Sequence, residues 1–233
     1  MEGVDKRYLT PTSIIDSDNR QVIKYALDII RGSKDPVEQA VKLYRAVRDD
    51  IRYDPYYPFY LPEHYRASNV LKNRRGFCIP KATLLCALLR ACGIPSRLGF
   101  ATVRNHLATK HLIDYLGTDL FVYHGYTDIY LEGKWVKATP TFNIEVCNRH
   151  KVPPLEFNGR EDAIFHAYNM ENKKYMEYIA YHGVYADVPV DKIVAVWEET
   201  YGRDRVAKWI DDFEASNGKK LEFDFEREEV VKL

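Results

Sequence analysis

Residues 76–95 constrain the fold of this chain more than any other stretch. They run Gly-Phe-Cys-Ile-Pro-Lys-Ala-Thr-Leu-Leu-Cys-Ala-Leu-Leu-Arg-Ala-Cys-Gly-Ile-Pro, and apolar side chains recur every three or four residues, which is the spacing of a buried helical face. The first glycine permits a sharp turn, and a proline is tolerated in the first turn of a helix. The closing Gly-Ile-Pro ends a helix. The sequence therefore predicts a helix from about Cys78 to Cys92.

Cys78 falls at the start of this predicted helix. The unpaired N–H groups and the dipole of a helix N-terminus stabilise a thiolate, so we expect the pKa of Cys78 to lie below the free value of about 8.5. The thiolate is the attacking species in acyl transfer. A small buried apolar residue is an equally good interpretation of the same cysteine. The nucleophile hypothesis therefore requires a base nearby.

A strand that carries such a base is predicted over residues 120–131, which are rich in aromatic and β-branched side chains and include His124. The following Glu-Gly pair suits a tight turn, and residues 134–139 return as the antiparallel partner. A single strand histidine is more often structural. His124 becomes a candidate base because a helix-start cysteine precedes it and a polar hairpin partner follows it.

The register of this hairpin brings an orienting group to the histidine. With a two-residue turn, Leu131 pairs with Lys134, which places Thr139 diagonal to His124 on one face of the sheet. Thr139 can then accept a hydrogen bond from one imidazole nitrogen while the other nitrogen faces the cysteine. Asp128 lies four residues along the strand from His124, about 13 Å away, and is excluded from this role.

Composition and charge narrow the class of protein. The chain has 233 residues, enough for one domain with a full core, and its 34 basic residues balance 34 acidic ones. Neutrality argues against nucleic acid or an anionic membrane surface as a partner. We expect a cytoplasmic protein, because the chain has neither an apolar run of about 20 residues nor a signal peptide. No Cys or His spacing suits zinc, so we expect no metal and no cofactor. The oligomeric state is left open.

The remaining segments predict a mixed α and β protein. Residues 53–67 contain three prolines and many aromatics, and form an irregular loop that is either one wall of a cleft or a lid packed on the core. Residues 104–118, with His106 and His111, are expected to form a polar flap. Helices are predicted over residues 18–31, 35–51 and 67–72 and in two segments ending near 202 and 217. Strands are predicted over residues 96–103 and 174–181, with an alternating, charged tail at 221–229.

Three blocks of the sequence resemble the transglutaminase-like superfamily. The first is Gly-x-Cys opening a helix that ends in Arg-Ala-x-Gly-Ile-Pro-x-Arg, the second is His124 on a strand ending in Tyr-Leu-Glu-Gly-Lys-Trp-Val, and the third is Thr139-Pro-Thr. The resemblance covers residues 37–142. It implies an α+β fold with a papain-like core, in which a central helix opened by the nucleophilic cysteine packs on an antiparallel sheet carrying the histidine. It also implies Cys78 as nucleophile, His124 as general base and acid, and a thioester intermediate.

Thr139 departs from the family pattern, which has Asp-Pro-Thr at this block. A hydroxyl can accept the imidazole hydrogen bond but supplies no negative charge. In a serine triad, replacing aspartate by asparagine costs about 10⁴ in rate, mostly through the wrong tautomer, an error that threonine avoids. Either the enzyme works with a polar orienting group, or the chain is a catalytically inactive binding or scaffold module. We favour activity because the cysteine and the histidine are both present. Asn143 and Glu145 are alternative orienting residues.

We therefore expect one transglutaminase-like domain over residues 1–233, with a core at about 37–142 and a C-terminal elaboration at about 144–233 that helps to shape the substrate pocket. The predicted activity is thiol-dependent acyl transfer or hydrolysis at an amide or other acyl bond of a peptide or small molecule. The acceptor, water or an amine, is left open. The backbone N–H of Cys78 and a tyrosine from residues 53–60 are expected to bind the oxyanion.

Overall fold

The computed structural model describes residues 3–216 and 224–229. Along the chain its elements are η1 (Lys6–Tyr8), α1 (Arg20–Ile29), α2 (Pro36–Asp50), β1 (Arg52–Tyr53), α3 (Pro62–Tyr65), α4 (Ala67–Asn73), β2 (Arg75–Gly76), α5 (Cys78–Ala91), β3 (Ser96–Asn105), α6 (Lys110–Leu116), β4 (Leu120–Leu131), β5 (Lys134–Ala138), α7 (Ile144–His150), β6 (Met176–Tyr185), α8 (Val190–Tyr201), α9 (Arg203–Ala215) and η2 (Phe225–Arg227).

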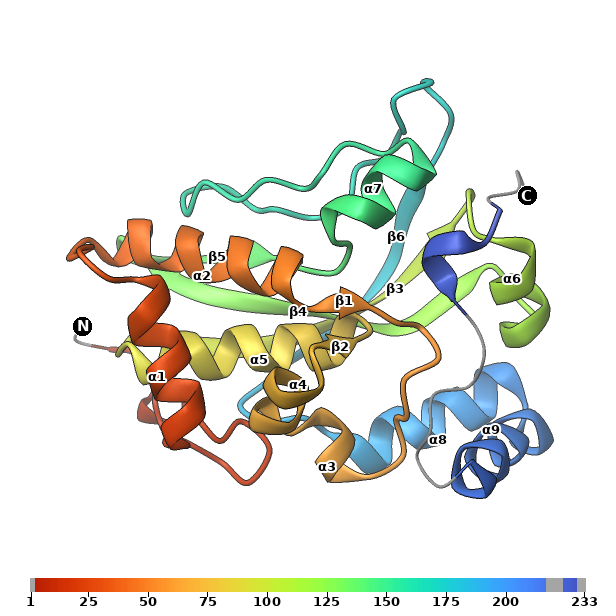
Figure 1. The fold of residues 1–233 in the computed structure, drawn as a ribbon, viewed down its shortest axis with the longest axis horizontal. Helices are drawn as coiled ribbons and strands as arrows, with labels where there is room; N and C mark the ends of the chain where they lie inside the picture. The colour runs from red at the N-terminus through yellow and green to blue at the C-terminus, as the bar shows by residue number, and fades with distance from the viewer. Residues whose placement is uncertain (1–2, 217–223, 230–233) are drawn as a thin grey trace.

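Helix α5 is the centre of the structure. It is the yellow helix in the middle of Figure 1. Three helices pack against it, α1, α2 and α4, and strands β3 and β4 of the sheet also contact it. Sequence periodicity predicted one apolar face, but every residue from Ile79 to Arg90 is buried, because helices and sheet both cover this helix. Its end is as predicted: Gly93 has φ +73°, and the Ile94 N–H donates to the Leu89 carbonyl at 2.9 Å.

An antiparallel sheet in the order β5-β4-β3-β6 supports this helix. The β4–β5 hairpin has the predicted register, with Leu131 opposite Lys134. Its turn residues, Glu132 and Gly133, have φ values of +48° and +85°, as a two-residue type I′ turn requires. Thr139 directly follows Ala138, the last paired residue of β5. The predicted register, which brings Thr139 toward His124, is therefore confirmed as far as Ala138.

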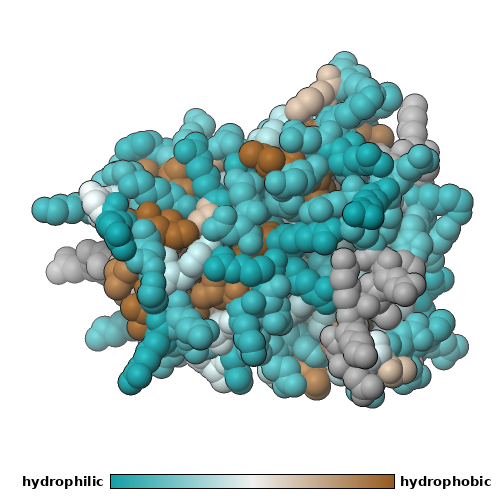
Figure 2. Space-filling view, viewed as in Figure 1, coloured by the Kyte–Doolittle hydropathy of each residue, from teal (hydrophilic) through white to brown (hydrophobic). Residues whose placement is uncertain are grey.

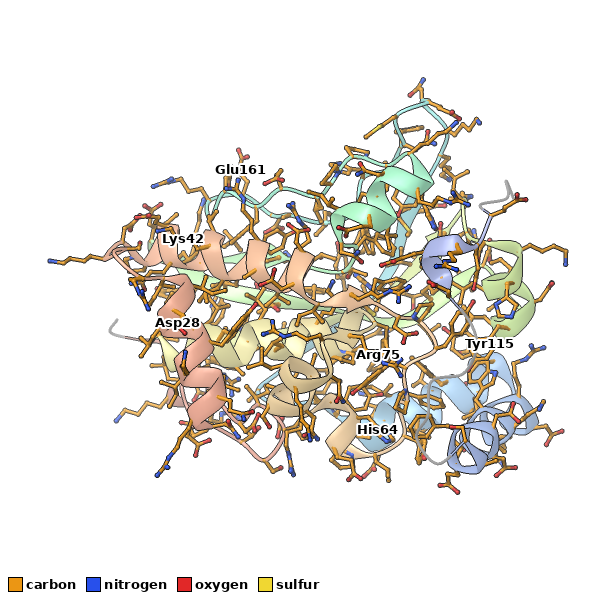
Figure 3. All side chains as sticks on the ribbon, viewed as in Figure 1. Asp28, Lys42, His64, Arg75, Tyr115 and Glu161 are labelled. Atoms are coloured by element: carbon orange, nitrogen blue, oxygen red, sulfur yellow. The ribbon has the colours of Figure 1, made fainter. Side chains whose placement is uncertain are left out.

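The segment between β1 and α3 is an aromatic lid on the core. Most of its rings are buried, and Phe59 packs against Trp197 of α8 with ring centroids 4.7 Å apart. Figure 3 shows this segment passing between Arg75 from β2 and Tyr115 from α6. Residues 104–118 were expected to form a flap; instead β3 extends to Asn105 and α6 follows, because the Thr109 side chain caps the helix at the Leu112 N–H.

A buried lysine closes the C-terminal end of α2. The Lys81 ammonium nitrogen lies 2.9 Å from the Arg48 carbonyl and 2.5 Å from the Ile51 carbonyl, and thus satisfies carbonyls that a helix end leaves without donors. Burial lowers the pKa of Lys81 to about 7. In the part of the chain that the structure describes, no helix is both long enough and apolar enough to span a lipid bilayer.

Candidate active site

Cys78 begins α5, as the sequence predicts, and its residue surface is partly exposed. Strand β2 pairs with β1 in parallel, with Gly76 opposite Tyr53, and this pairing delivers the cysteine to the start of the helix. The backbone N–H groups of Gly125, Ile79 and Cys78 itself lie close enough to the sulfur to lower its pKa. The helix N-terminus therefore does present donors to the thiol, together with one donor from the neighbouring strand.

The expected low pKa of Cys78 is wrong for this structure. Burial of the sulfur outweighs the three N–H donors and raises the pKa to about 11. Although part of the residue surface remains accessible, the dense packing around the sulfur controls its ionisation. The helix-start argument omitted this desolvation, which comes from side chains distant in the sequence. At neutral pH the thiol form of Cys78 is therefore favoured in this closed structure.

Gly125 allows strand β4 to approach the start of α5. A Cβ at this position would lie 3.0 Å from Ile79 Cγ1, 3.1 Å from Ile79 Cα and 3.3 Å from Ile79 Cβ, which is closer than ordinary carbon contacts of about 3.5–4.0 Å. Only a glycine permits this approach without displacement, and the approach places the Gly125 N–H at the sulfur of Cys78. His124, the adjacent residue, is thereby brought to the same place.

His124 is 4% exposed and follows a β-bulge. The β3–β4 register shifts between the pairs Ala101–His124 and Val103–Phe121, and Tyr123 lies in the bulge with φ +54°, in the left-handed region that a bulky residue rarely adopts. A bulge re-aims the side chains beside it. The local strain at Tyr123 therefore accompanies the orientation of the candidate base.

Aromatic side chains cover the imidazole of His124. The Phe165 ring lies 4.7 Å from it, centroid to centroid, at an interplanar angle of 35°, and the Tyr178 ring lies edge-on at 6.3 Å. Both come from the C-terminal third, which therefore does shape the site as predicted. Burial among these rings lowers the pKa of His124 to about 3. The histidine is therefore neutral at pH 7, and so is its neighbouring thiol.

Cys78 and His124 line the same two small cavities. The cavities measure about 30 and about 50 Å³. Because roughly 10–15 Å³ holds one water, each has room for a few waters at most. Residues common to both linings are Tyr53, Cys78, Leu112, Phe121 and His124. The two side chains that the sequence singles out are thus on shared walls, in a site whose cavities are too small for larger molecules in this structure.

Thr139 is 1% exposed, and its hydroxyl oxygen has no hydrogen-bond partner among residues 3–216 and 224–229. The same holds for Nε2 of His124. Tyr178 contacts the imidazole ring, and its hydroxyl approaches Thr139 without reaching hydrogen-bond geometry. Thr139 and His124 therefore both lie beside Tyr178, and each has a buried polar atom without a hydrogen-bond partner within the described part of the chain. The two residues are not hydrogen-bonded to each other.

The alternative orienting residues are engaged elsewhere. The Asn143 amide donates to Glu145 at 2.6 Å and accepts from the Tyr53 N–H at 3.0 Å. Asp128 pairs with Arg97 at 2.8 Å, in agreement with its exclusion from the sequence. Of the orienting residues considered from the sequence, Thr139 is thus the one whose polar atom is still available. The Thr141 hydroxyl is likewise buried without a partner in the described residues, and Thr141 lines the smaller cavity with Cys78 and His124.

The family of the chain can be assigned from its sequence match. A model of the transglutaminase-like superfamily matches residues 23–140, just over half of the chain. The chain belongs to this superfamily. The match begins within α1, earlier than the predicted boundary at residue 37, and with the mixed architecture it confirms the predicted α+β fold. Membership supports thiol-dependent acyl transfer or hydrolysis as the general chemistry. That all 233 residues form one domain stays a prediction.

Solved structures similar to this superfamily member include a candidate cysteine protease from Cytophaga hutchinsonii (16% identity, TM-score 0.48, 79% of this chain and 55% of that one). A candidate protease from Parabacteroides distasonis is 18% identical, with TM-score 0.36, over 55% and 26% of the two chains. An arylamine N-acetyltransferase from Mycobacterium abscessus is 16% identical, with TM-score 0.38, over 57% and 46%. The chain thus covers less than two thirds of each. No curated protein matches it.

Several residues at the transglutaminase-like site were not identified from the sequence. A glycine inside a strand often marks close backbone approach, so Gly125 carried a usable signal. Phe165, Tyr178 and Phe225 carried none, because their positions depend on the path of the C-terminal third. Of the tyrosines at 53–60, Tyr53 lines both cavities.

The other histidines considered from the sequence lie in polar contacts. His106 Nε2 lies 3.0 Å from a Glu177 carboxylate oxygen, and His111 Nδ1 lies 2.7 Å from the Tyr56 hydroxyl. Across the described ranges, no three Cys, His, Asp or Glu side chains converge as a metal site requires.

Proposed function

We propose that the chain is a cysteine acyltransferase or amide hydrolase acting on a peptide or small-molecule acyl group. The observation that carries this proposal is the juxtaposition of Cys78 and His124 on the walls of the same two cavities. The nearness of the Gly125 N–H to the sulfur supports it, because that donor belongs to the residue next to the histidine. Membership of the transglutaminase-like superfamily supports the same chemistry.

The neutral state of both groups suggests the order of proton transfer. Since burial opposes a preformed thiolate–imidazolium pair, His124 takes the thiol proton as the sulfur attacks the acyl carbon. The tetrahedral oxyanion is then held by the Cys78 N–H and the Tyr53 hydroxyl. The imidazolium returns its proton to the leaving amine, which departs and leaves a thioester. Water or an acceptor amine attacks the thioester, and His124 accepts the proton of that nucleophile, which passes to the departing sulfur.

Thr139 is proposed to orient His124 during these steps. A threonine hydroxyl can accept the N–H of an imidazole, and the Thr139 oxygen and Nε2 of His124 are both buried polar atoms without partners in the described structure. Burying such atoms costs free energy unless they are paired. A small movement that joins them relieves both costs and fixes the imidazole for proton transfer.

The alternative is an inactive binding or scaffold module. The absence of a carboxylate at position 139 and the unfavourable ionisation of both site residues favour this alternative. It predicts that Cys78→Ala leaves ligand binding unchanged and that Thr139→Asp creates no activity. The catalytic proposal predicts the loss of all turnover in Cys78→Ala.

An acyl-trapping experiment separates the two. The protein is incubated with a panel of activated acyl donors, beginning with p-nitrophenyl acetate, and its mass and peptide map are recorded. We expect one acyl adduct, on Cys78, and a rate about 100-fold lower in His124→Gln. Cys92 is the internal control, because it is also partly exposed and burial also raises its pKa to about 11. Equal acylation of Cys78 and Cys92, or an unchanged rate in His124→Gln, contradicts the proposal.

A further inference from the structure

Residues 224–229 lie against the candidate site, far from it in sequence. Figure 1 shows the short blue turn of η2 between α6 and α7. Phe225 is buried and lines the same cavity as Cys78 and His124. Its ring packs edge-on against Tyr53, with centroids 5.1 Å apart, and at a tilt of 39° against His150 of α7, with centroids 5.0 Å apart. An aromatic side chain of the chain itself therefore forms one wall of the catalytic cavity.

Arg52 of β1 binds the carboxylates on either side of Phe225. Its guanidinium group forms ion pairs with Asp224 and with Glu226, the second at 3.0 Å. The Asn143 amide also donates to Glu226, at 3.3 Å. Guanidinium groups are the preferred partners of carboxylates. The two acidic neighbours of the phenylalanine are thus recognised by groups at the edge of the cavity.

Glu228 is held by groups from the aromatic lid and from the start of α6. It accepts hydrogen bonds from the Tyr56 hydroxyl at 2.7 Å and the Thr109 hydroxyl at 2.5 Å, and His111 Nδ1 lies 3.2 Å away. Tyr56 belongs to the aromatic lid, and Thr109 caps α6. The space-filling view shows hydrophilic side chains over this turn (Figure 2), with the Phe225 ring buried beneath. The segment is thus held by three carboxylates and one buried ring.

We propose that residues 224–228 occupy the substrate cleft as a pseudosubstrate, and that the cleft binds peptide segments in which an aromatic side chain is flanked by carboxylates. This inference rests on the proposed function, since it identifies the substrate class of the same site. The ring takes the position of the substrate side chain beside Cys78. Arg52, Tyr56 and Thr109 recognise the carboxylates.

Two observations support reversible occupation. With Phe225 in place, the cavity of about 30 Å³ that it lines admits only water-sized groups, so a larger substrate group can enter this cavity only if this wall moves. The ion pairs that hold Asp224 and Glu226 are partly exposed, with side-chain exposures of 28% and 26%. Ion pairs of this kind are weak and screened by salt. The ion pairs of Asp224 and Glu226 therefore oppose the departure of the segment only weakly.

The first test measures the rate at which iodoacetamide labels Cys78 in the full chain, relative to Cys92 in the same molecule. We expect Phe225→Ala to raise this ratio about tenfold or more, because labelling follows the open population of the site. Phe213→Ala is the matched control, since Phe213 packs against Tyr60 and His64 away from the cavity, and it should leave the ratio unchanged. An unchanged ratio in Phe225→Ala, or an equal rise in Phe213→Ala, overturns the proposal.

The second test measures recognition in trans. A fluorescent peptide, Asp-Phe-Glu-Arg-Glu, is titrated into a full-length chain carrying Asp224→Asn, Phe225→Ala and Glu228→Gln. We expect it to bind this variant about tenfold or more tightly than the wild-type chain, where its site is occupied. Replacing the phenylalanine of the peptide by alanine, or its carboxylates by amides, should each abolish binding. Equal binding of all three peptides, or of both proteins, contradicts the inference.

The two proposals can fail separately. Labelling and peptide binding do not require acyl transfer, and the peptide titration can be repeated in Cys78→Ala. If both tests succeed but no acyl donor modifies Cys78 in any variant, the segment occupies a binding cleft and the catalytic proposal is wrong. If Cys78 is acylated equally in wild type and Phe225→Ala, the catalytic proposal stands and the pseudosubstrate is rejected.

Discussion

The close approach of β4 to α5 makes Gly125→Ala the most direct test of the site geometry. The added methyl group would lie 3.1 Å from a backbone atom of Ile79, and a backbone atom cannot rotate away. Overpacking of this kind costs about 1–3 kcal/mol. The substitution also restricts the unfolded chain, which returns roughly 0.4–1 kcal/mol. The net destabilisation is about 1.5 kcal/mol, or roughly 3–6 °C in melting temperature for a chain of this length.

The larger consequence concerns chemistry. Displacing β4 moves the Gly125 N–H and His124 away from Cys78, and a misplacement of about 1 Å can cost about 100-fold in rate. We therefore expect the rate at which p-nitrophenyl acetate acylates Cys78, measured from the intact mass of the protein, to fall tenfold or more. Each factor of ten in this rate corresponds to ~1.4 kcal/mol in the activation free energy.

Gly133→Ala is the matched control for Gly125→Ala. Gly133 lies in the β4–β5 turn with φ +85° and no atom within 4 Å of an added Cβ. Its substitution costs about 1–2 kcal/mol of backbone strain, but it leaves the site in place. A wild-type melting temperature and acylation rate in Gly125→Ala, or an equal loss of rate in Gly133→Ala, would refute the reasoning.

Further predictions concern single groups. Thr139→Val should raise the free energy of unfolding, measured by urea denaturation, by about 1 kcal/mol, because it removes an unpaired buried hydroxyl. The same substitution should slow the acylation of Cys78, and faster acylation would exclude the orienting role. Tyr53→Phe should lower the acylation rate about 100-fold, as loss of an oxyanion donor does, and an unchanged rate would reject that donor. Because the pKa of folded Lys81 is about 7, below its ordinary value of 10.5, the unfolded state binds more protons between these pH values. Stability should therefore rise with pH in this window, less steeply in Lys81→Met. Burial raises the pKa of Cys78 to about 11 from an ordinary value of 9, so its thiolate fraction at pH 8 is ~100-fold lower than that of an ordinary cysteine. The rate of Cys78 alkylation should therefore increase most steeply near pH 11. A pH profile of alkylation with its midpoint near 8.5 would contradict this prediction.

Local features of the fold were predictable because they depend on neighbouring residues. The limits of α5 follow from a helix-start segment and a closing glycine, and the β4–β5 register follows from a two-residue turn. Together they correctly placed Cys78 at the start of a helix and His124 on the adjacent sheet. Sequence alone could not determine how deeply these residues are buried, because the covering rings of Phe165 and Phe225 come from chain segments outside the family match.

That burial changes the chemistry expected of Cys78. A helix N-terminus alone favours the thiolate, and three nearby N–H groups lower the pKa of the sulfur, but its burial favours the thiol more strongly. The same enclosure removes the charge from His124. If Phe225 leaves, water reaches both groups, and the desolvation that opposes their ionisation falls. Access of a substrate and activation of the nucleophile are then consequences of one movement, so a variant that opens the site should lower the pKa of Cys78 as well as speed its labelling.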